Sequence, residues 1–448
     1  MTLTLTKALR IQPADTVAFI GSGGKTTAIF QLARQIPPPV IVTATSHLGS
    51  WQIPEADRQV IASSGFIDQV EQNLNGVTLV TGALDGDRTA PIADNLLDEL
   101  HRFCKNRNVT LLIEADGSRQ RPLKAWAEHE PPIPAFVDHV VLVAGLAGLG
   151  KQLNDEFVHR PELFSSLSRL DSGEVIDVNA FVRVLLHENG GLKNIPQSAR
   201  RSVLLNQTDT PELQAAAHAM ANSLLSKFDS VVISNLEQKV IHAVHEKVAG
   251  IILAAGESSR YGQPKQLLDW HGESFVRVVA RRALEAGLSP VIVVTGANAE
   301  EIETAVSDLD VRFVRNSEWK SGQASSIRAG IFSLTHAPLP RGERYAGAAI
   351  FFLVDQPQVT TSIVSALREK HAEGLYPIVA PMVMDRRANP VLFDRETFPD
   401  LLTLEGDVGG RAIFHKHRVE YLPWHDDRLL LDVDTPEQYQ RLIADETL

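Results

Sequence analysis

The sequence is short of cysteine, because Cys104 is the single one among 448 residues. One cysteine cannot close a disulfide within the chain, and it offers no cysteine cluster for a structural zinc ion. Long apolar runs are also missing: no stretch approaches the roughly 20 residues that cross a bilayer. Residues 1–10 lack the apolar core of a signal peptide. These absences predict a cytoplasmic protein that does not engage a membrane.

Positive charge is in deficit as well. Lysine and arginine number 43 against 55 aspartates and glutamates, so the formal net charge is −12. This balance argues against a general nucleic-acid binder, and it requires any phosphate site to be built locally. Hydrophobic residues make up 44% of the chain, which is typical of a globular protein with a large core.

The length predicts two domains of roughly 200 residues each. We expect one domain over residues 1–235 and another over residues 249–448. The stretch between them, residues 236–248, has no glycine, serine or proline richness. It therefore predicts a short and helical join rather than a flexible tether.

A glycine-bounded loop at residues 253–268 is the most informative stretch. It reads LAAGESSRYGQPKQLL and follows an apolar run at residues 249–253 that is typical of a buried strand. Glycines let a ligand approach the backbone, and Arg260 and Lys265 add charge suited to a triphosphate. An ordinary strand-to-helix connection with surface cations is the alternative. We expect Arg260 and Lys265 to be catalytic, and nucleotide contacts from Leu253, Ala254, Ala255, Gly256 and Gly262.

This loop resembles the signature of the MobA/MocA-like nucleotidyltransferases, whose pattern runs LAAGxSxRxGxxKxLL. The resemblance continues through the later segments and covers essentially all of residues 249–448. It implies transfer of a nucleotide to molybdopterin. One departure is Arg386-Arg387-Ala388, where relatives usually have a glycine-containing loop, so the acceptor side follows the family less closely than the nucleotide side.

Polar residues follow the strands of the second half. The apolar segment 348–354 indicates a central strand that delivers Asp355 at its carboxyl end. We interpret Asp355 and Asp434 as a magnesium pair, with Asp355 also catalytic. A helix N-cap is an alternative role for Asp434. Ser325 is expected to contact the nucleotide, and the polar loops 389–393 and 406–411 are expected to hold the acceptor.

The first half has a second phosphate-loop candidate. A strand at residues 16–20 runs into Gly-Ser-Gly-Gly-Lys-Thr-Thr and then into a helical stretch at residues 28–35. Backbone N–H groups, a helix N-terminus and an ammonium group there predict phosphate binding. Phe19 stands where the usual P-loop has glycine, so the loop is a shortened form. The expected contacts come from Gly21, Gly24, Lys25 and Thr26.

Carboxylates follow the strand at residues 109–113. Glu114 or Asp116 is expected to hold magnesium together with the Thr26 hydroxyl, although the pattern does not choose between the two acids. Arg119, Arg121 and Lys124 form a basic cluster that either binds a second anion or is a solvated loop. The run Asn206-Gln207-Thr208-Asp209 has the form of a guanine-reading NKxD motif, with glutamine in place of lysine.

These features of the first half resemble the YqeC family, whose members are accessory proteins for selenium-dependent molybdenum hydroxylases. The resemblance rests on GSGGKTT, Thr-Ala-Thr-Ser-His, Glu-Ala-Asp-Gly-Ser-Arg and Val-His-Arg-Pro, and it spans most of residues 10–235. It implies nucleotide binding and a role in cofactor maturation. It implies no particular reaction.

Together the patterns predict an α/β protein with two doubly wound, mainly parallel sheets, a P-loop-like domain and then a Rossmann-like nucleotidyltransferase domain. The implied ligands are Mg²⁺, an NTP and molybdopterin as acceptor, and the implied protein partner is a molybdenum hydroxylase apoenzyme. Ala255, in LAAG rather than the LAGG of guanylyl-transferring relatives, favours CTP. A sugar- or alcohol-phosphate nucleotidyltransferase and a non-catalytic cofactor chaperone are the alternatives.

Overall fold

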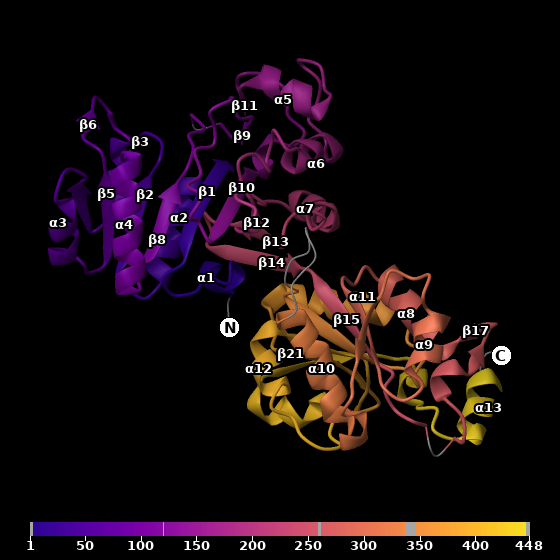
Figure 1. Ribbon diagram of the computed structural model, residues 1–448. Coiled ribbons are helices and arrows are strands. Elements are labelled where there is room, and N and C mark those ends of the chain that lie inside the picture. The colour runs from indigo at the N-terminus through magenta and orange to yellow at the C-terminus, as the bar shows by residue number, and fades with distance from the viewer. Residues whose placement is uncertain (1–2, 120, 259–260, 337–345, 445–448) are drawn as a thin grey trace. The chain divides into compact units, whose positions relative to one another are not determined.

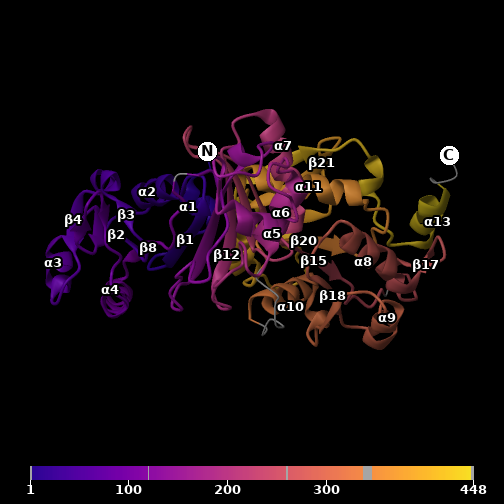
Figure 2. The ribbon, with the colours of Figure 1, turned by 90° about the horizontal axis from the view of Figure 1, so that it is seen from above.

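The computed structural model describes residues 3–119, 121–258, 261–336 and 346–444. The chain divides into two compact units, Met1–His245 and Glu246–Leu448. In each unit helices flank a central sheet (Figures 1 and 2). None of the described helices is both long enough and apolar enough to cross a bilayer.

The first unit is built on a nine-stranded sheet of order β14-β13-β12-β10-β1-β8-β2-β5-β4. The pairs from β13 through β4 are parallel. Most of these strands are buried along their whole length, which suits near-continuous apolar runs covered by helices on both faces. The strands are β1 (Thr16–Ser22), β2 (Val40–Ala44), β4 (Arg58–Ile61), β5 (Val77–Thr81), β8 (Thr110–Glu114), β10 (His139–Gly145), β12 (Arg200–Asn206), β13 (Ser230–Asn235) and β14 (Val240–Glu246).

Helices and short strands complete this unit. Three helices begin with a side-chain cap: Thr4 accepts from Lys7 N, Asp177 from Ala180 N, and Thr210 from Leu213 N. The helices are α1 (Leu5–Ala8), α2 (Lys25–Gln35), α3 (Phe66–Gln72), α4 (Asp94–Arg107), α5 (Pro161–Ser168), α6 (Val178–Leu186) and α7 (Pro211–Leu224). The short strands are β3 (Leu48–Gly49), β6 (Leu84–Asp85), β7 (Arg88–Thr89), β9 (Leu123–Lys124) and β11 (Val158–His159).

The second unit is built on an eight-stranded mixed sheet. Its order is β19-β18-β15-β20-β23-β21-β22, with β24 paired to β21. Strands β19, β18, β15 and β20 are parallel, whereas β23 runs antiparallel between β20 and β21. The strands are β15 (Val248–Leu253), β18 (Val291–Thr295), β19 (Arg312–Arg315), β20 (Ala348–Leu353), β21 (Ile378–Val383), β22 (Arg386–Arg387), β23 (Val391–Asp394) and β24 (Val419–Pro423). A separate hairpin pairs β16 (Asp269–Trp270) with β17 (Glu273–Ser274).

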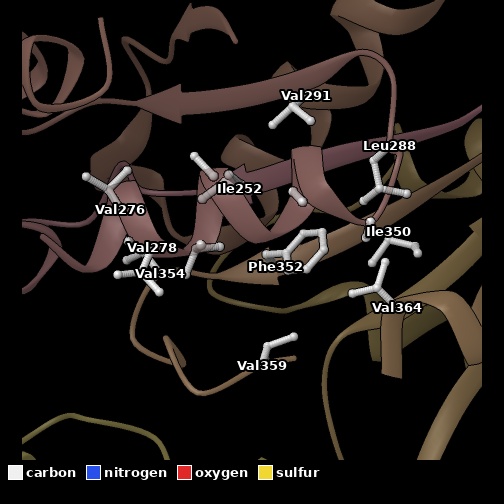
Figure 3. Packing of buried hydrophobic residues seen from close by; sticks show 14 of the residues in the cluster. Ile252, Val276, Val278, Leu288, Val291, Ile350, Phe352, Val354, Val359 and Val364 are labelled. Atoms are coloured by element: carbon white, nitrogen blue, oxygen red, sulfur yellow. The ribbon is translucent and has the colours of Figure 1, made fainter. Parts of the chain in front are cut away.

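Successive side chains of the central strands pack into two different cores, as the period of two in a strand requires. Ile252 and Phe352 belong to the core that includes α8 (Phe275–Glu285) and α11 (Thr361–Gly374) (Figure 3). Their neighbours Ile251 and Phe351 belong to the opposite core, which includes α10 (Gln323–Thr335) and α12 (Phe398–Leu401). The remaining helices are α9 (Ala299–Ala305) and α13 (Pro436–Ala444).

The predicted fold class is confirmed, because both units are α/β with mainly parallel sheets. Two local predictions are wrong. Residues 240–246 of the expected helical join form strand β14 at the sheet edge beside β13. Its residues Val240, Ile241 and Val244 are of types that favour strands. Residues 391–394, expected in a polar acceptor loop, form the fully buried strand β23. Hydrogen bonding to two neighbouring strands leaves that backbone unavailable to a ligand.

Candidate functional site

A cavity of about 590 Å³ opens at the carboxyl ends of β15 and β20 in the second unit. Ligands collect at this edge of a parallel α/β sheet, because the loops that leave it converge there. Six predicted residues line the cavity, namely Leu253, Ala255, Gly256, Lys265, Asp355 and Asp434. The structure thus brings the glycine loop and both predicted metal ligands to one site.

The loop after β15 is held in place by one buried amide. The Gln266 side chain donates to the carbonyls of Ala254 at 3.1 Å and Gly256 at 2.7 Å, and its oxygen accepts from Ser258 Oγ. The Ser258 hydroxyl also accepts from the backbone N–H of Lys265 at 3.1 Å. These bonds fix the loop's curvature, and both Ser258 and Gln266 also line the cavity.

The backbone at Gly256 faces open space in the cavity. A Cβ atom at this position would meet no heavy atom within 4 Å, and the residue lines the cavity. Packing within the protein therefore does not require glycine there. A ligand that approaches the backbone closely would require it.

Lys265 joins the two predicted metal ligands. Its Nζ lies 3.0 Å from Asp355 Oδ2 and 2.7 Å from Asp434 Oδ1. Burial by itself would lower the pKa of Lys265, but the two carboxylates outweigh it and raise that pKa overall. The lysine is therefore fully charged at neutral pH, beside a cavity of the size that a small ligand occupies.

Backbone contacts deliver Asp434 to this place. Val433 N donates to the carbonyl of Asp355 at 3.1 Å, and Gln438 Oε1 accepts from Asp434 N at 2.7 Å. The alternative role of Asp434 as a helix N-cap is not what the structure shows, because the hydroxyl of Thr435 accepts from Gln438 N. The Asp434 carboxylate is instead bound to Lys265.

The carboxylate oxygens of Asp355 and Asp434 are of the type that binds a magnesium ion. Asp355 Oδ1 is buried and accepts no hydrogen bond, although a buried carboxylate oxygen normally has a partner. Asp432 lies near Asp355, whose charge together with burial raises the pKa of Asp432, but its Oδ1 accepts from Gln356 Nε2. Carboxylate oxygens are the protein ligands that Mg²⁺ prefers, and it takes its other ligands from phosphates and water. Among the residues that the structure describes, no group of three or more His, Cys, Asp or Glu side chains is arranged to hold a metal ion, so the protein would supply only the Asp355 and Asp434 carboxylates.

The remaining predicted residues of the second unit have other places. Arg260 lies outside the described residues. Ser325 does not line the cavity: its hydroxyl donates toward the carbonyls of Glu318 and Gly322, and Ser326 lines the cavity instead. Ser325 lies next to Ser326 in helix α10, and its expected contact with the nucleotide stays a prediction. Ala254 is buried beneath the loop, and neither it nor Gly262 lines the cavity.

Sequence reasoning missed two residues that shape the cavity. Lys320 lines it, and Gln266 supports the loop. Gln266 lies between Lys265 and Leu267, and no local pattern indicated that its side chain is buried. Asp407, which also lines the cavity, comes from a loop that we had assigned to the acceptor.

The second candidate site is the loop between β1 and α2 in the first unit. Gly21 has a φ of 96°, and a Cβ atom there would lie 2.1 Å from the carbonyl oxygen of Val143. Only glycine fits this close approach to β10. The loop then enters helix α2 at Lys25, three residues before the start of the predicted helical stretch at residue 28.

Lys25 is engaged inside the protein. Its Nζ donates to the Gly21 carbonyl at 2.6 Å and lies 3.2 Å from Asp116 Oδ1. Asp116 also accepts from Lys124 Nζ at 2.9 Å, from Trp126 Nε1 at 2.7 Å and from Gly21 N. Burial would raise the pKa of Asp116, but the two lysines lower it below its ordinary value. The Asp116 carboxylate is thus ionised and already fully engaged by donors.

Glu114 is the acid that meets Thr26. The Thr26 hydroxyl donates to Glu114 Oε2 at 3.3 Å, at the end of strand β8. Burial raises the pKa of Glu114, and the charge of Lys25 opposes that rise. Of the two acids that the sequence left open, Glu114 is the one placed opposite Thr26, whereas Asp116 neutralises the lysines.

The other polar features of this unit are mostly structural. Lys124 is buried and bound to Asp116, so it is engaged inside the protein, whereas Arg121 is exposed and donates to the carbonyl of Glu156; a second anion site there stays a prediction. Asn206 donates to the Gly23 carbonyl at 2.8 Å and accepts from Leu236 N, which ties the glycine loop to the end of β13. The guanine-reading role of Asp209 stays a prediction.

Two family models match the chain. The model of the MobA-like NTP transferase domain covers residues 250–421, and the model of the YqeC protein covers residues 17–162. The two matched stretches lie in different structural units.

Each individual relative matches less than half of the chain. Nicotine blue oxidoreductase of Paenarthrobacter nicotinovorans is 31% identical over 44% of this chain and 96% of its own length. The uncharacterized protein YqeC of Escherichia coli is 30% identical over 43% of this chain and 75% of its own. The molybdenum cofactor cytidylyltransferase of Escherichia coli is 22% identical over 42% of this chain and 92% of its own. Probable molybdenum cofactor guanylyltransferases are similar to the chain as well.

Proposed function

Because the chain belongs to the MobA-like NTP transferase family over residues 250–421 and to the YqeC family over residues 17–162, we propose that it transfers CMP from CTP to molybdopterin or its molybdenum-bearing form. Pyrophosphate is the second product. The first unit acts as an accessory nucleotide-binding domain in the maturation of a molybdenum hydroxylase, whose apoenzyme receives the product.

The observation that carries this proposal is the contact of Lys265 with both Asp355 and Asp434 beside the Gly256 cavity. A phosphate oxygen of the acceptor forms a bond to the α-phosphorus of CTP. The bond from that phosphorus to the bridging oxygen breaks, and pyrophosphate leaves with the electron pair. Such a transfer needs positioning and charge neutralisation rather than a protein nucleophile.

We assign a separate role in the transfer to each residue of the site in the second unit. Lys265 supplies positive charge for the phosphates, and the open backbone at Gly256 lets the nucleotide approach the loop. Asp355 and Asp434 would hold Mg²⁺, which when bound neutralises phosphate charge. The proposal for CTP rests on Ala255, which lines the cavity.

In the first unit, Gly21, Gly24, Lys25 and Thr26 form the proposed phosphate loop, and Glu114 is the proposed magnesium-side acid. The contact of Thr26 with Glu114 supports this pairing. The Lys25 ammonium is held by the Asp116 carboxylate and the Gly21 carbonyl. It would have to give up part of these contacts to reach a phosphate.

The test is an assay of pyrophosphate release from CTP, GTP and ATP with molybdopterin and Mg²⁺. We expect release from CTP, and we expect Asp355→Asn to reduce its rate by a factor of about 10² or more, as loss of a transition-state contact does. The exposed Asp385→Asn is the matched control and should leave the rate unchanged. Release from no NTP, or full activity in Asp355→Asn, overturns the proposal. Turnover only with sugar or alcohol phosphates would assign the alternative acceptor class, and tight pterin binding without NTP consumption would assign a chaperone.

A further inference from the structure

The carboxyl ends of β12 and β13 carry polar residues to which the proposed function gives no role. Strands β1, β10, β12 and β13 are paired in parallel and lie side by side (Figure 1). Ser22 is in register with Ala144, and Gly145 with Asn206, so all four strands end at the same edge of the sheet. Because neighbouring strands lie roughly 5 Å apart, the end of β12 lies about 10 Å from the end of β1.

Asn206 joins this edge to the phosphate loop of the first unit (residues 21–26). Its Nδ2 donates to the Gly23 carbonyl at 2.8 Å, and a Cβ atom on Gly24 would lie only 2.4 Å from the same nitrogen. The Thr208 hydroxyl donates to the Ser234 carbonyl at 2.9 Å, which links the segment after β12 to the end of β13. The phosphate loop and the two strand ends are therefore one connected structure.

Asp209 presents a carboxylate that is exposed but held in place. Asn235 Nδ2 donates to Asp209 Oδ1 at 2.5 Å, and Asn235 itself is 2% exposed. Asp209 does not cap helix α7, because the Thr210 hydroxyl accepts from Leu213 N. Within the described part of the chain Asp209 forms no ion pair, and Asn235 is the one hydrogen-bond partner of its side chain. The fold itself therefore does not account for a fixed carboxylate at this position.

Gln207 lies between Asn206 and Asp209 in a strained conformation. Its φ is 62°, in the left-handed region that side chains other than asparagine and aspartate rarely adopt. Its Oε1 is buried and has no hydrogen-bond partner, and a Cβ atom on Gly145 would lie 2.3 Å from that oxygen. Backbone strain and an unpaired buried oxygen both cost free energy, and both occur at ligand sites. A donor on a bound ligand would satisfy this oxygen.

We propose that the first unit binds a guanine nucleotide, with the phosphates on residues 21–26 and the base at Asp209. Guanine carries two adjacent donors, N1–H and the 2-amino group, and a single carboxylate can accept from both. Adenine and cytosine present a ring-nitrogen acceptor in place of N1–H, which a carboxylate repels. This inference rests on the proposed role of the first unit in nucleotide binding, and it adds the identity of the base. The two units would then bind different nucleotides.

The experiment is isothermal titration of the full chain with nucleoside diphosphates, in the presence of Mg²⁺ and an excess of CTP. GDP should bind about tenfold or more tightly than ADP, and also than IDP, which lacks the 2-amino group, as expected for loss of a hydrogen bond to a charged group. The comparison with IDP uses the native protein and does not depend on the folding of a variant.

Asp209→Asn provides a second readout that a structural role would not produce. The asparagine amide offers one acceptor and one donor, which match N1–H and the 2-oxo group of xanthine. The variant should therefore lose about tenfold or more in affinity for GDP and gain a similar factor for XDP. Asp85→Asn, at an exposed position in β6, removes the same charge and should change neither affinity.

Three results would overturn the assignment of guanine and leave phosphate binding by the loop intact. They are equal affinity of the native protein for GDP, IDP and ADP, a GDP affinity that Asp209→Asn leaves unchanged, and displacement of GDP by CTP, which would place GDP in the second unit. If no diphosphate binds, the nucleotide-binding role of the first unit fails as well. Pyrophosphate release from CTP tests the second unit separately, so the two failures are distinguishable.

Discussion

Among the substitutions of charged residues that we propose, replacement of Asp116 should destabilise the first unit most. The carboxylate is buried and bound to Lys25 and Lys124, both of which are also buried. In Asp116→Ala two ammonium groups would remain in the protein interior without their counterion. Removal of one partner from a buried ion pair costs about 3–5 kcal/mol.

The expected shift in melting temperature follows from this magnitude. For a unit of this size, 1 kcal/mol moves Tm by roughly 2–4 °C, so Asp116→Ala should lower the Tm of the first unit by about 6–20 °C. Asp116→Asn keeps one acceptor oxygen and should lower it less. The pKa of Asp116 lies below its unfolded value of 3.8. Its stabilising effect is therefore fully present above about pH 4 and is lost as the pH falls through the folded pKa.

Differential scanning calorimetry of the full chain measures this effect. The transition of the second unit is the one that CTP shifts upward, and it should not move in Asp116→Ala. Asp85→Ala, at an exposed position in β6, removes the same charge and is the control. A shift below about 2 °C in Asp116→Ala, or an equal shift in the control, would refute the view that this carboxylate compensates two buried lysines.

Four further outcomes are expected. Lys265→Ala should reduce kcat/KM for pyrophosphate release by about 10²-fold or more, because it removes preorganised positive charge; an unchanged rate would show that the contact is structural. Gln266→Ala should raise the KM for CTP, since both bonds that curve the loop are lost, and a normal KM would contradict that role. Glu114→Gln should raise the Tm of the first unit at pH 8, because the raised folded pKa of Glu114 makes its ionised form costly; the difference should vanish as the pH falls toward the ordinary value of 4.5. EDTA should abolish pyrophosphate release and added Mg²⁺ should restore it, and activity that survives the chelator would exclude the Asp355 metal site.

Much of the fold was predictable from local patterns. The predicted strands at residues 16–20, 109–113, 249–253 and 348–354 all exist to within two residues, because buried parallel strands are short apolar runs bounded by turn residues. The two wrong predictions concern strands β23 and β14, where the flanking residues concealed a strand. Residues 391–394 carry three apolar side chains after Asn389-Pro390, and the polar flanks concealed a buried strand. Residues 240–246 form a strand that begins only a few residues after β13, without the glycine or proline that usually marks a new element.

The sites were predictable in kind but less so in detail. Lys265, Asp355 and Asp434 were found because strand ends and glycine loops collect ligands in α/β sheets. Ser326 rather than the neighbouring Ser325 lines the cavity, since a helix turns each successive residue by a large angle. The choice between Glu114 and Asp116 could not be made from the sequence, because both follow the same strand two residues apart.

The sequence by itself determined the two α/β sheets, the two glycine loops and the acids at the strand ends, because each depends on residues that are neighbours along the chain. Only the tertiary structure decided which of these residues meet. Lys265 contacts Asp355 and Asp434 across 90 and 169 residues of sequence, and Asp116 forms ion pairs with Lys25 and Lys124. Contacts at such separations depend on how the sheet orders its strands, which the local pattern of any one segment does not specify.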